Sequence, residues 1–472
     1  MTFETSSEPG VAVKVGAKPA LLRGLNVWHA TSIVAGTIIG SGIFLVPAEM
    51  MQAVGSAGLV YLAWVVGGLL SFFGALTYAE LGSVRPFAGG EYVYVRDAYG
   101  PLPAFLYGWT WFLIAKPASI ATVTAGLVRV LGTFSAFGFL PQTLFALHVT
   151  SNRVLVVNYG HLVAIAATVL ITALNYVGVR KAGNFQFAFT VLKVGMIVGI
   201  AVIAFMAASG SWSNFGTSFA GAKGGVAGFM AALVAALWAY DGWNDLNMVS
   251  EEIQRPERSI PVALIAGVGL VAVLYMGMNA GIQKALPAEV IANSAVPAAA
   301  ASETAIGQLG VSLVSMGMMI SMLATLNGTV MSGGRVPFAV ARDGYFFRAL
   351  GEVHPKFHTP ALALVIQAAV AIILIVVGGA FRELFSLAIF AEWLFYMVAA
   401  STIFVFRRRE PDVKRPYRTM GYPLVPALFI GTAAVLLYYT FTSNVKNSVG
   451  GLLVILLGIP VYLWFRRKRP AR

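Results

Sequence analysis

The amino-acid sequence predicts an all-α polytopic membrane protein with twelve transmembrane helices. Of its 472 residues, 58% are hydrophobic and only 11% are charged, whereas soluble domains carry about 25% charged residues. The apolar residues come in blocks of roughly 20, enough to cross a hydrocarbon core about 30 Å thick. Lysine and arginine collect in every second connection between these blocks. Polar surface is therefore too scarce to cover a water-soluble globule of this size.

Each predicted span corresponds to one apolar block of the sequence. The spans cover residues 27–50, 57–82, 101–130, 157–178, 185–208, 225–249, 262–284, 311–333, 360–378, 384–406, 423–441 and 447–465. Residues 1–22 are small and polar and lack the apolar core of a cleaved signal peptide, so we expect a cytoplasmic disordered tail. The connections are loop-sized, and no soluble domain is expected between the spans.

The distribution of positive charge predicts the orientation. Twelve spans place both termini on one side of the membrane, and connections rich in lysine and arginine stay in the cytoplasm. The segments on the side of the termini carry Lys14, Lys18, Arg23, Arg85, Arg96, Arg180, Lys181, Arg255, Arg258, Arg342, Arg348, Lys356, Arg407, Arg408, Arg409, Lys414, Arg415, Arg418, Arg466, Arg467, Lys468, Arg469 and Arg472, and the opposite loops carry only Arg153, Lys223, Lys284, Arg382 and Lys446. We therefore expect both termini in the cytoplasm. Topology and anionic lipid account for the net charge of +13, so nucleic acid is not expected as a partner.

The sequence contains few residues or motifs that would support enzymatic catalysis or metal binding. It contains no cysteine, which excludes disulfides, thiolate metal sites and cysteine nucleophiles. The five histidines are scattered, and neither an HExxH motif nor a phosphate-binding loop is present. A channel would need polar residues repeated along several helices, whereas here they gather at two positions. We expect no metal, no cofactor and no enzymatic activity, and a channel or membrane enzyme is the remote alternative.

Small residues interrupt the first apolar block. Gly36, Gly40, Ser41 and Gly42 lie within it, and one interpretation is that they let helix backbones pack closely. The functional interpretation is that residues 40–42 unwind and free backbone amides in the middle of the membrane. Free amides at the start of a half-helix bind anions, of which a substrate carboxylate is the obvious one.

The sixth block contains a carboxylate and a glycine between two tryptophans. Its sequence runs Trp238-Ala239-Tyr240-Asp241-Gly242-Trp243-Asn244. Asp241 either solvates itself at a water-filled rim or marks a second break, whose freed carbonyls hold an ammonium group. An unpaired charge inside a membrane costs at least about 2.5–3.5 kcal/mol, which makes such a residue a functional candidate. Two interrupted helices in corresponding positions indicate a transporter with its binding site at the breaks.

Two lysines fall inside predicted spans. Lys193 either extends its long side chain to the membrane surface or forms an internal cation beside the broken first helix, where a coupling ion would otherwise sit. Lys116 lies deeper, and a kink at Pro117 would aim it at a cavity. At predicted cytoplasmic helix ends, Glu80 and the Glu251 and Glu252 pair either form gating salt bridges with nearby arginines or anchor the helices at the interface.

At these motifs the chain resembles the amino acid–polyamine–organocation superfamily and, within it, the L-type amino acid transporter family. The resemblance runs over residues 22–420. It is carried by residues 36–44, 78–82, 86, 89–92, 116–119, 239–244, 251–261, 327–328 and 335–344. Several long motifs in the same order make the resemblance specific.

The resemblance implies a LeuT-like fold, with two inverted five-helix repeats, broken first and sixth helices and two further helices at the C-terminus. The repeats would cover residues 27–208 and 225–406, within a transporter core of residues 23–415. Residues 416–472 would hold the last two helices and a basic cytoplasmic end. The implied function is sodium-independent exchange of L-amino acids, neutral ones by preference, by alternating access in a bacterial cytoplasmic membrane.

The resemblance also assigns residues to the site. The substrate-binding residues that it implies are Ile38, Gly40, Ser41, Gly42, Trp238, Ala239, Tyr240, Asp241, Gly242 and Asn244. Among them, the Ser41 and Gly42 amides would bind the substrate carboxylate. The carbonyls of Ile38, Trp238 and Asp241 would bind its amino group, with Trp238 and Tyr240 shaping the pocket and Asn244 adding a polar wall. Lys193 matches a lysine thought to replace a sodium ion. Further cavity or gating candidates are Lys116, Trp243, Glu80, Glu252 and Asn327.

The chain also departs from the family pattern. Asp241 stands where many animal relatives have glycine, which leaves cationic and hydroxylated side chains open as substrates. The animal members are light subunits joined by a disulfide to a glycoprotein, and a chain without cysteine cannot form that link. We expect it to work alone, as the bacterial relatives do. The runner-up function is a proton-coupled symporter in which Lys193 or Asp241 titrates.

Overall fold

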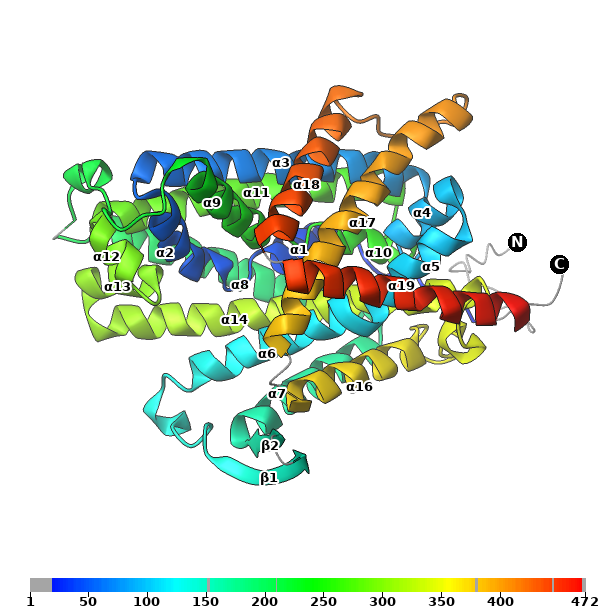
Figure 1. Cartoon of the computed structure of the whole chain (residues 1–472), viewed down its shortest axis with the longest axis horizontal. Helices are drawn as coiled ribbons and strands as arrows, with labels where there is room; N and C mark the ends of the chain where they lie inside the picture. Colours follow the sequence, from blue (N-terminus) through cyan, green and yellow to red (C-terminus); the bar gives the residue numbers. More distant parts are fainter. Residues whose placement is uncertain (1–18, 151–152, 209, 378–380, 444, 469–472) are drawn as a thin grey trace, which may run out of the picture.

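The computed structural model is predominantly helical and describes residues 19–150, 153–208, 210–377, 381–443 and 445–468. The predicted N-terminal tail, residues 1–22, lies almost wholly outside the described residues, and so do residues 469–472 of the basic C-terminus. The helices are, in chain order, α1 Val27–Ile38, α2 Gly42–Val54, α3 Ala57–Val84, α4 Glu91–Tyr99, α5 Pro101–Thr110, α6 Lys116–Leu131, α7 Tyr159–Tyr176, α8 Val179–Phe205, α9 Gly225–Ala239, α10 Asp245–Met248, α11 Pro256–Ala285, α12 Ala288–Asn293, α13 Pro297–Ile306, α14 Gln308–Gly333, α15 Arg335–Arg342, α16 Ala361–Val377, α17 Phe381–Arg409, α18 Leu424–Ser443 and α19 Val445–Lys468. The long helices α3, α11 and α14 run nearly parallel, and α17 and α18 cross them obliquely (Figure 1).

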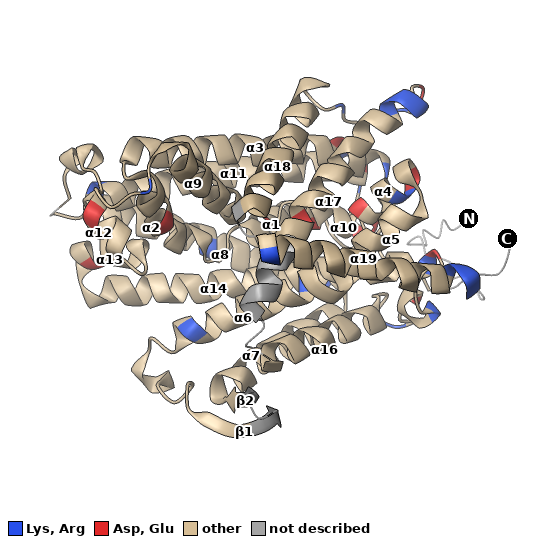
Figure 2. Cartoon of the chain, viewed as in Figure 1, with Lys and Arg blue, Asp and Glu red and all other residues tan. Residues whose placement is uncertain are grey.

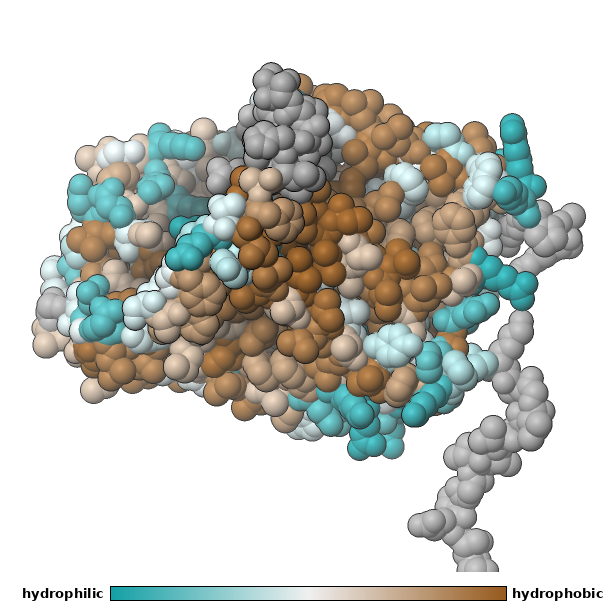
Figure 3. Space-filling view, turned by 90° about the horizontal axis from the view of Figure 1, so that it is seen from below, coloured by the Kyte–Doolittle hydropathy of each residue, from teal (hydrophilic) through white to brown (hydrophobic). Residues whose placement is uncertain are grey.

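Ten helical segments of the described chain are long and apolar enough to cross a membrane. Two shorter apolar helices, α9 and α16, have 15 and 17 residues. Large apolar side chains such as Leu170 and Val273 are exposed on the outside of the bundle. One face of the molecule is apolar along its centre, with hydrophilic side chains toward both ends (Figure 3). The chain is therefore a multi-pass membrane protein, and each predicted span falls largely on helix.

Two apolar segments are interrupted where the sequence predicts breaks. The chain leaves α1 at Ile38 and enters α2 at Gly42, and it leaves α9 at Ala239 and enters α10 at Asp245. At the second break Gly242 has φ = +108°, a conformation that residues with a Cβ rarely adopt. The breaks face each other, because a Cβ on Gly242 would lie 3.3 Å from the Ile38 nitrogen.

Helix α1 lies in the interior of the bundle, against α8, α11 and α14. Nine of its twelve residues are buried. Its backbone approaches α8 closely at Gly36, where an added Cβ would overlap the side-chain ends of Gln186 and Thr190. A Cβ on Gly328 of α14 would overlap Thr37 in the same way. Glycine permits such close backbone approach in membrane bundles, and it brings polar side chains of α8 and α14 within reach of the α1 backbone.

A β-hairpin connects α6 to α7, where the sequence analysis expected a loop in an all-α protein. Strand β1, Thr143–Thr150, pairs antiparallel with β2, Arg153–Asn158, and Leu147 lies opposite Leu155. The hairpin lies beside α7 at one edge of the bundle (Figure 1). The purely α-helical prediction is therefore wrong at this connection. A two-stranded pair satisfies its backbone groups locally, so it needs no long apolar block that hydropathy would reveal.

The described chain begins at residue 19 and ends at residue 468 at the same end of the bundle, which we call the termini face (Figure 1). Lysine and arginine gather there, as the sequence analysis predicted, in the segments that carry Arg85, Arg96, Arg342, Arg407 and Arg466 (Figure 2). The opposite face carries α12, α13 and the outer end of α6 (Figure 1).

Gly36→Ala is expected to lower the melting temperature of the purified protein in detergent. The new methyl group must displace Gln186 and Thr190 from the contact between α1 and α8, and overpacking of this kind costs about 1–3 kcal/mol. The matched control is Gly199→Ala in α8, where nothing lies within 4 Å of the added Cβ. Equal melting temperatures for the two variants would contradict the close packing of α1.

Candidate ligand-binding site at the helix breaks

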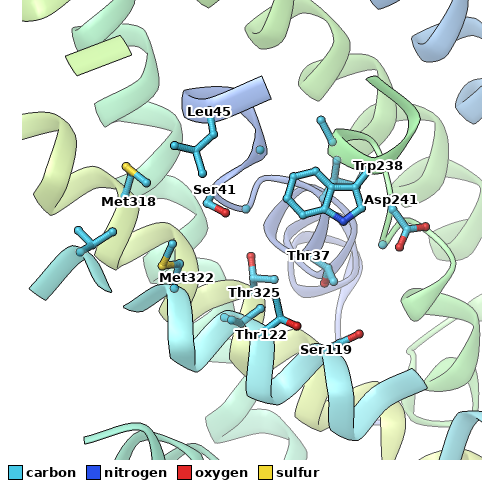
Figure 4. A pocket seen from close by; sticks show the side chains of 18 of the residues that line it. Thr37, Ser41, Leu45, Ser119, Thr122, Trp238, Asp241, Met318, Met322 and Thr325 are labelled. Atoms are coloured by element: carbon cyan, nitrogen blue, oxygen red, sulfur yellow. The ribbon is translucent and has the colours of Figure 1, made fainter. Parts of the chain in front are cut away.

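Both breaks open on the same cavity, which has a volume of about 450 Å³. Small-molecule sites typically occupy ~300–1,000 Å³. Figure 4 shows side chains from α1, α2, α6, α9, α14 and the two breaks around this cavity, among them Thr37, Ser41, Leu45, Ser119, Thr122, Trp238, Asp241, Met318, Met322 and Thr325. Segments far apart in the sequence therefore meet at one hollow in the interior of the bundle.

The cavity extends from the breaks toward the face opposite the termini. On α14 a residue from each turn lines it, from Thr329 at the centre to Val311 near the outer end. Along α6 and just beyond its end, it reaches Arg129 and Thr133, which are exposed. At its inner end Asp245 is fully buried. The cavity is therefore accessible from the opposite face and closed toward the termini face.

The first break presents unpaired backbone amides to this cavity. Ser41 and Gly42 line it, and α2 begins at Gly42. In the part of the chain that the structure describes, neither residue's N–H has a hydrogen-bond acceptor. These amides lie at the N-terminal end of α2, which is the positive end of the helix dipole. The arrangement is suited to a carboxylate.

Carbonyl groups at the ends of α1 and α9 lie on the other side of the breaks. The hydroxyl of Tyr275 in α11 lies 3.2 Å from Ile38 O and 2.9 Å from Ala239 O, so it can donate to either. The Asp241 N–H donates to Trp238 O at 3.2 Å. Among the described residues, no donor reaches the carbonyl oxygen of Asp241 itself. Tyr275 thus ties the two breaks together, and the sequence analysis missed it because its only signal was a tyrosine inside an apolar block.

Lys193 of α8 holds the end of α1. Its side chain is 1% exposed. Nζ donates to Gly36 O at 2.6 Å and to Ile39 O at 2.7 Å, and it lies 3.4 Å from Ser321 O of α14. The structure therefore places the Lys193 side chain in the interior beside the first break and not at the membrane surface.

Two hydroxyl groups of α14 complete this contact. Ser321 Oγ donates to Ile39 O at 2.7 Å, and Thr325 Oγ1 lies 3.3 Å from Gly36 O and 3.2 Å from Ile39 O. Neither residue was predicted from the sequence, although hydroxyl residues four apart in an apolar helix are an available signal. Together with Lys193 they satisfy the carbonyls that the break leaves unpaired.

A buried ion pair lies at the inner end of the cavity. Lys116 of α6 donates to Asp245 Oδ1, and Ser332 Oγ of α14 donates to Asp245 Oδ2 at 2.9 Å. Lys116 lines the cavity as the sequence analysis expected, but its charge is engaged by a carboxylate that the analysis did not consider. A π-helical turn, Trp111–Ala115, precedes Lys116 and joins α5 to α6.

Two further carboxylates line the cavity. Asp241 Oδ1 accepts a hydrogen bond of 3.0 Å from Tyr396 OH of α17. Glu392, one turn before Tyr396 on the same helix, also lines the cavity. Asp241 was predicted from the sequence and Glu392 was not, although an acidic residue inside a predicted span is an available signal.

Only some of the residues predicted to bind substrate or to line a cavity do line this one. Its wall includes Ile38, Gly40, Ser41, Gly42, Lys116, Trp238, Ala239, Asp241 and Gly242. Tyr240 and Trp243 are almost fully buried behind it, against aromatic side chains of α3. Asn244 Nδ2 donates to Glu91 Oε1 at 2.7 Å, and Asn327 links α14 to α7 and α8. These four residues support the wall without reaching the cavity.

Ion pairs bridge the helices at the termini face. Glu80 of α3 pairs with Arg407 at 2.6 Å, and Glu252 pairs with Arg335 at 2.8 Å. Glu251 also pairs with Arg342 at 2.9 Å. Burial raises the pKa of the Glu252 carboxyl, and the Arg335 guanidinium opposes that rise. Glu80, Glu251 and Glu252 therefore all form salt bridges, with partners that lie far from them in the sequence.

Comparison with known proteins identifies relatives along the whole chain. The sequence profile of the amino acid permease family matches residues 25–465. The chain is 31% identical over 454 residues to the serine/threonine exchanger SteT of Bacillus subtilis, which covers 95% of this chain and 98% of that protein. It is 31% identical over 455 residues to the cystine/glutamate transporter of Homo sapiens, with 96% and 86% covered. It is 31% identical over 453 residues to the large neutral amino acids transporter small subunit 2 of Oryctolagus cuniculus, with 95% and 81% covered.

Lys193→Met is expected to lower the melting temperature in detergent more than Lys181→Met does. The first change removes the lysine donor shared by the buried carbonyls of Gly36 and Ile39, and losing a hydrogen bond to a charged group costs about 1.5–3 kcal/mol. Lys181 lies on the same helix and is exposed, so its replacement serves as the control. A Lys193→Met protein as stable as this control would contradict the structural role of the ammonium group.

Proposed function

Because the chain belongs to the amino acid permease family, we propose that it exchanges L-amino acids across a membrane, neutral ones by preference and without sodium. The observation that carries this proposal is the meeting of both helix breaks at one cavity. Free amides of Ser41 and Gly42 lie on one side, and carbonyls of Ile38 and Asp241 on the other. An α-amino acid carries one carboxylate and one ammonium group, and this pair of backbone surfaces complements both.

Lys193 supports the absence of sodium coupling. Its ammonium group occupies the space between three main-chain carbonyls, of Gly36, Ile39 and Ser321. Such a ring of carbonyls is a ligand set for a sodium ion. A fixed cation in that position stabilises the first break at all times, so transport would not have to wait for an ion to bind.

The fold that we propose for this function has twelve spans. Two inverted five-helix repeats, residues 27–208 and 225–406, would be followed by α18 and α19. The two breaks lie in the first and sixth predicted spans, which are corresponding positions of the two repeats. Alternating access would then consist of one group of helices moving against the other around the breaks.

The orientation follows from charge. The termini face carries most lysines and arginines, which supports its assignment to the cytoplasm (Figure 2). The cavity would then be open to the outside, and the ion pairs of Glu80, Glu251 and Glu252 would form the closed cytoplasmic gate. A transporter of this design performs no covalent chemistry and needs no disulfide-linked subunit. A chain without cysteine cannot form such a disulfide.

The substrate class rests on the relatives. One is named as a serine/threonine exchanger and another as a transporter of large neutral amino acids. A proton-coupled symporter on the same scaffold is the second candidate, because the carboxylate of Asp241 lies in the cavity and could carry a proton with the substrate.

Uptake of labelled amino acids into proteoliposomes tests the proposal. We expect labelled L-serine to enter vesicles loaded with unlabelled L-serine and not empty ones, with no response to a sodium gradient. Uptake into empty vesicles driven by a pH gradient would favour the proton symporter and overturn exchange. Vesicles with heat-inactivated protein provide the background.

Replacement of Ser41 and Gly42 by leucine in one double variant is expected to abolish this exchange. A Cβ on Gly42 already lies 3.1 Å from Ala239 Cβ and 3.4 Å from Trp238, so larger side chains would cover the free amides. The control is Gly58→Leu, an exposed position with nothing within 4 Å of the added Cβ. Both proteins must elute as monodisperse species, and undiminished exchange by the double variant would overturn the assignment of the amides.

A further inference from the structure

Four exposed cations at the termini face belong to two segments that lie far apart in the sequence. Three follow one another at the end of α19, where Figure 2 shows lysine and arginine. The fourth begins the 3₁₀ turn Arg348–Gly351, in the connection between α15 and α16. We call these side chains the cationic cluster, which consists of Arg348, Arg466, Arg467 and Lys468.

Aromatic rings hold the two parts of the cationic cluster together. The centroid of the Phe465 ring lies 5.5 Å from that of Phe346 and 5.3 Å from that of Phe347. One helical turn earlier on α19, Tyr462 stacks on Tyr345 at 5.3 Å. The residues that directly follow Phe465 and Phe347 belong to the cluster, so these contacts bring cations of α19 next to the cation of the connection.

The salt bridges of the described chain include none of the four cations. Other arginines of the termini face are paired, for example Arg85 with Glu410 and Arg342 with Glu251. Glu352, the acidic residue nearest to the cluster along the chain, is exposed and does not take part in these pairs. Like charges repel one another, so a bound anion would stabilise the arrangement of the cluster.

The side chains of α19 indicate how deep the cluster lies in the membrane. Leu453, Leu456 and Leu457, which precede the cluster on this helix, are exposed on the outside of the bundle. Trp464 is 45% exposed, and Lys468 Nζ lies 3.8 Å from the centroid of its ring. Tryptophan is enriched at the interface between membrane and water. The cations that follow Trp464 therefore lie at the level of the lipid headgroups.

We propose that the cationic cluster is a binding site for the phosphate group of an anionic phospholipid, with phosphatidylglycerol as the probe. Lys and Arg clusters next to a membrane helix attract anionic lipid, and guanidinium groups bind phosphate oxygens through paired hydrogen bonds. The phosphate of a lipid fits better than a soluble anion, because the exposed rings of Trp464 and Phe347 flank the cations and offer contact to acyl chains.

The connection that carries Arg348 also takes part in closing the termini face. Asp343, at its start, pairs with Arg96 of α4 at 2.7 Å. Phe346 packs against Phe112, in the π-helical turn between α5 and α6, with ring centroids 5.3 Å apart. The cluster is thus assembled in a structure whose cavity is closed toward the termini face. A lipid bound across α19 and this connection favours that state.

Quenching of tryptophan fluorescence measures the binding without reference to transport. Protein in detergent is titrated with phosphatidylglycerol or with phosphatidylcholine, each brominated on its acyl chains, and the signal of Trp464 is the difference between wild type and Trp464→Phe. We expect phosphatidylglycerol to quench Trp464 at a concentration lower by about tenfold or more, because each cation near anionic lipid contributes roughly fivefold. Equal quenching by the two lipids would overturn the site. Displacement of phosphatidylglycerol by inorganic phosphate would overturn the choice of a lipid.

Two triple variants separate the cluster from the general charge of the termini face. Arg348→Gln, Arg466→Gln and Arg467→Gln together are expected to weaken quenching by phosphatidylglycerol about tenfold or more. The control combines Arg408→Gln, Lys414→Gln and Arg418→Gln, which remove as many charges from exposed positions of the same face and should leave quenching unchanged. Unchanged quenching in the cluster variant, or an equal loss in both, would overturn the site. Should the cluster variant fail to fold, Arg466→Gln with Arg467→Gln, both exposed at the end of α19, takes its place.

Serine exchange tests the consequence for transport, which rests on the proposed function. In vesicles that contain phosphatidylglycerol, the maximal rate of wild-type exchange is expected to be lower than in vesicles of phosphatidylcholine alone, since the lipid favours the closed termini face. The cluster variant should exchange at the same rate in both. A wild-type rate that ignores phosphatidylglycerol would overturn the coupling to the termini face. Absence of exchange in every vesicle would overturn the proposed function instead, while the quenching result still decides the lipid site.

Discussion

A helix that breaks inside a bilayer leaves backbone groups that water cannot reach, and each unsatisfied group costs several kcal/mol. At the first break, the ammonium group of Lys193 and two hydroxyls of α14 donate hydrogen bonds to the carbonyls of Gly36 and Ile39, which would otherwise be unsatisfied. The amides on the other side of the same break have no such partner. The rest of the site depends on this asymmetry, because it holds α1 in place and leaves the donors of α2 available to a ligand.

Lys193 can reach the carbonyls of α1 only because the neighbouring helices pack closely against α1. Glycine at position 36 brings α8 near enough for Thr190 and Gln186 to reach Ser32 O, at 3.1 and 3.3 Å. The second buried lysine is stabilised differently, by the carboxylate of Asp245. Main-chain carbonyls thus accept the hydrogen bonds of Lys193, and the carboxylate of Asp245 pairs with Lys116. The remaining carboxylates of the cavity are therefore available to interact with a ligand.

The cavity therefore divides into two ends of different origin. Main-chain groups of the two breaks form one end, which in the proposed function would bind the amino and carboxyl groups common to all amino acids. Side chains of α6, α9, α14 and α17 and of the second break form the other end. Relatives with about the same identity to this chain are named for different amino acids, which agrees with a shared backbone surface and a variable side-chain surface.

The membrane class, the positions of the helices, the two breaks and the charge asymmetry between the faces could be predicted from the sequence, because each of these follows from residues that are neighbours in the chain. It also named Lys193 and Asp241, since ionisable residues stand out in apolar blocks. It gave no account of the hairpin at 143–158, where local pairing replaces apolar length. The contact of Lys193 with Ile39, the pairing of Lys116 with Asp245 and the shared cavity of Glu392 and Asp241 became visible only in the folded protein. These pairs lie more than a hundred residues apart, and their contact depends on how the helices pack, which hydropathy and spacing along one helix do not record.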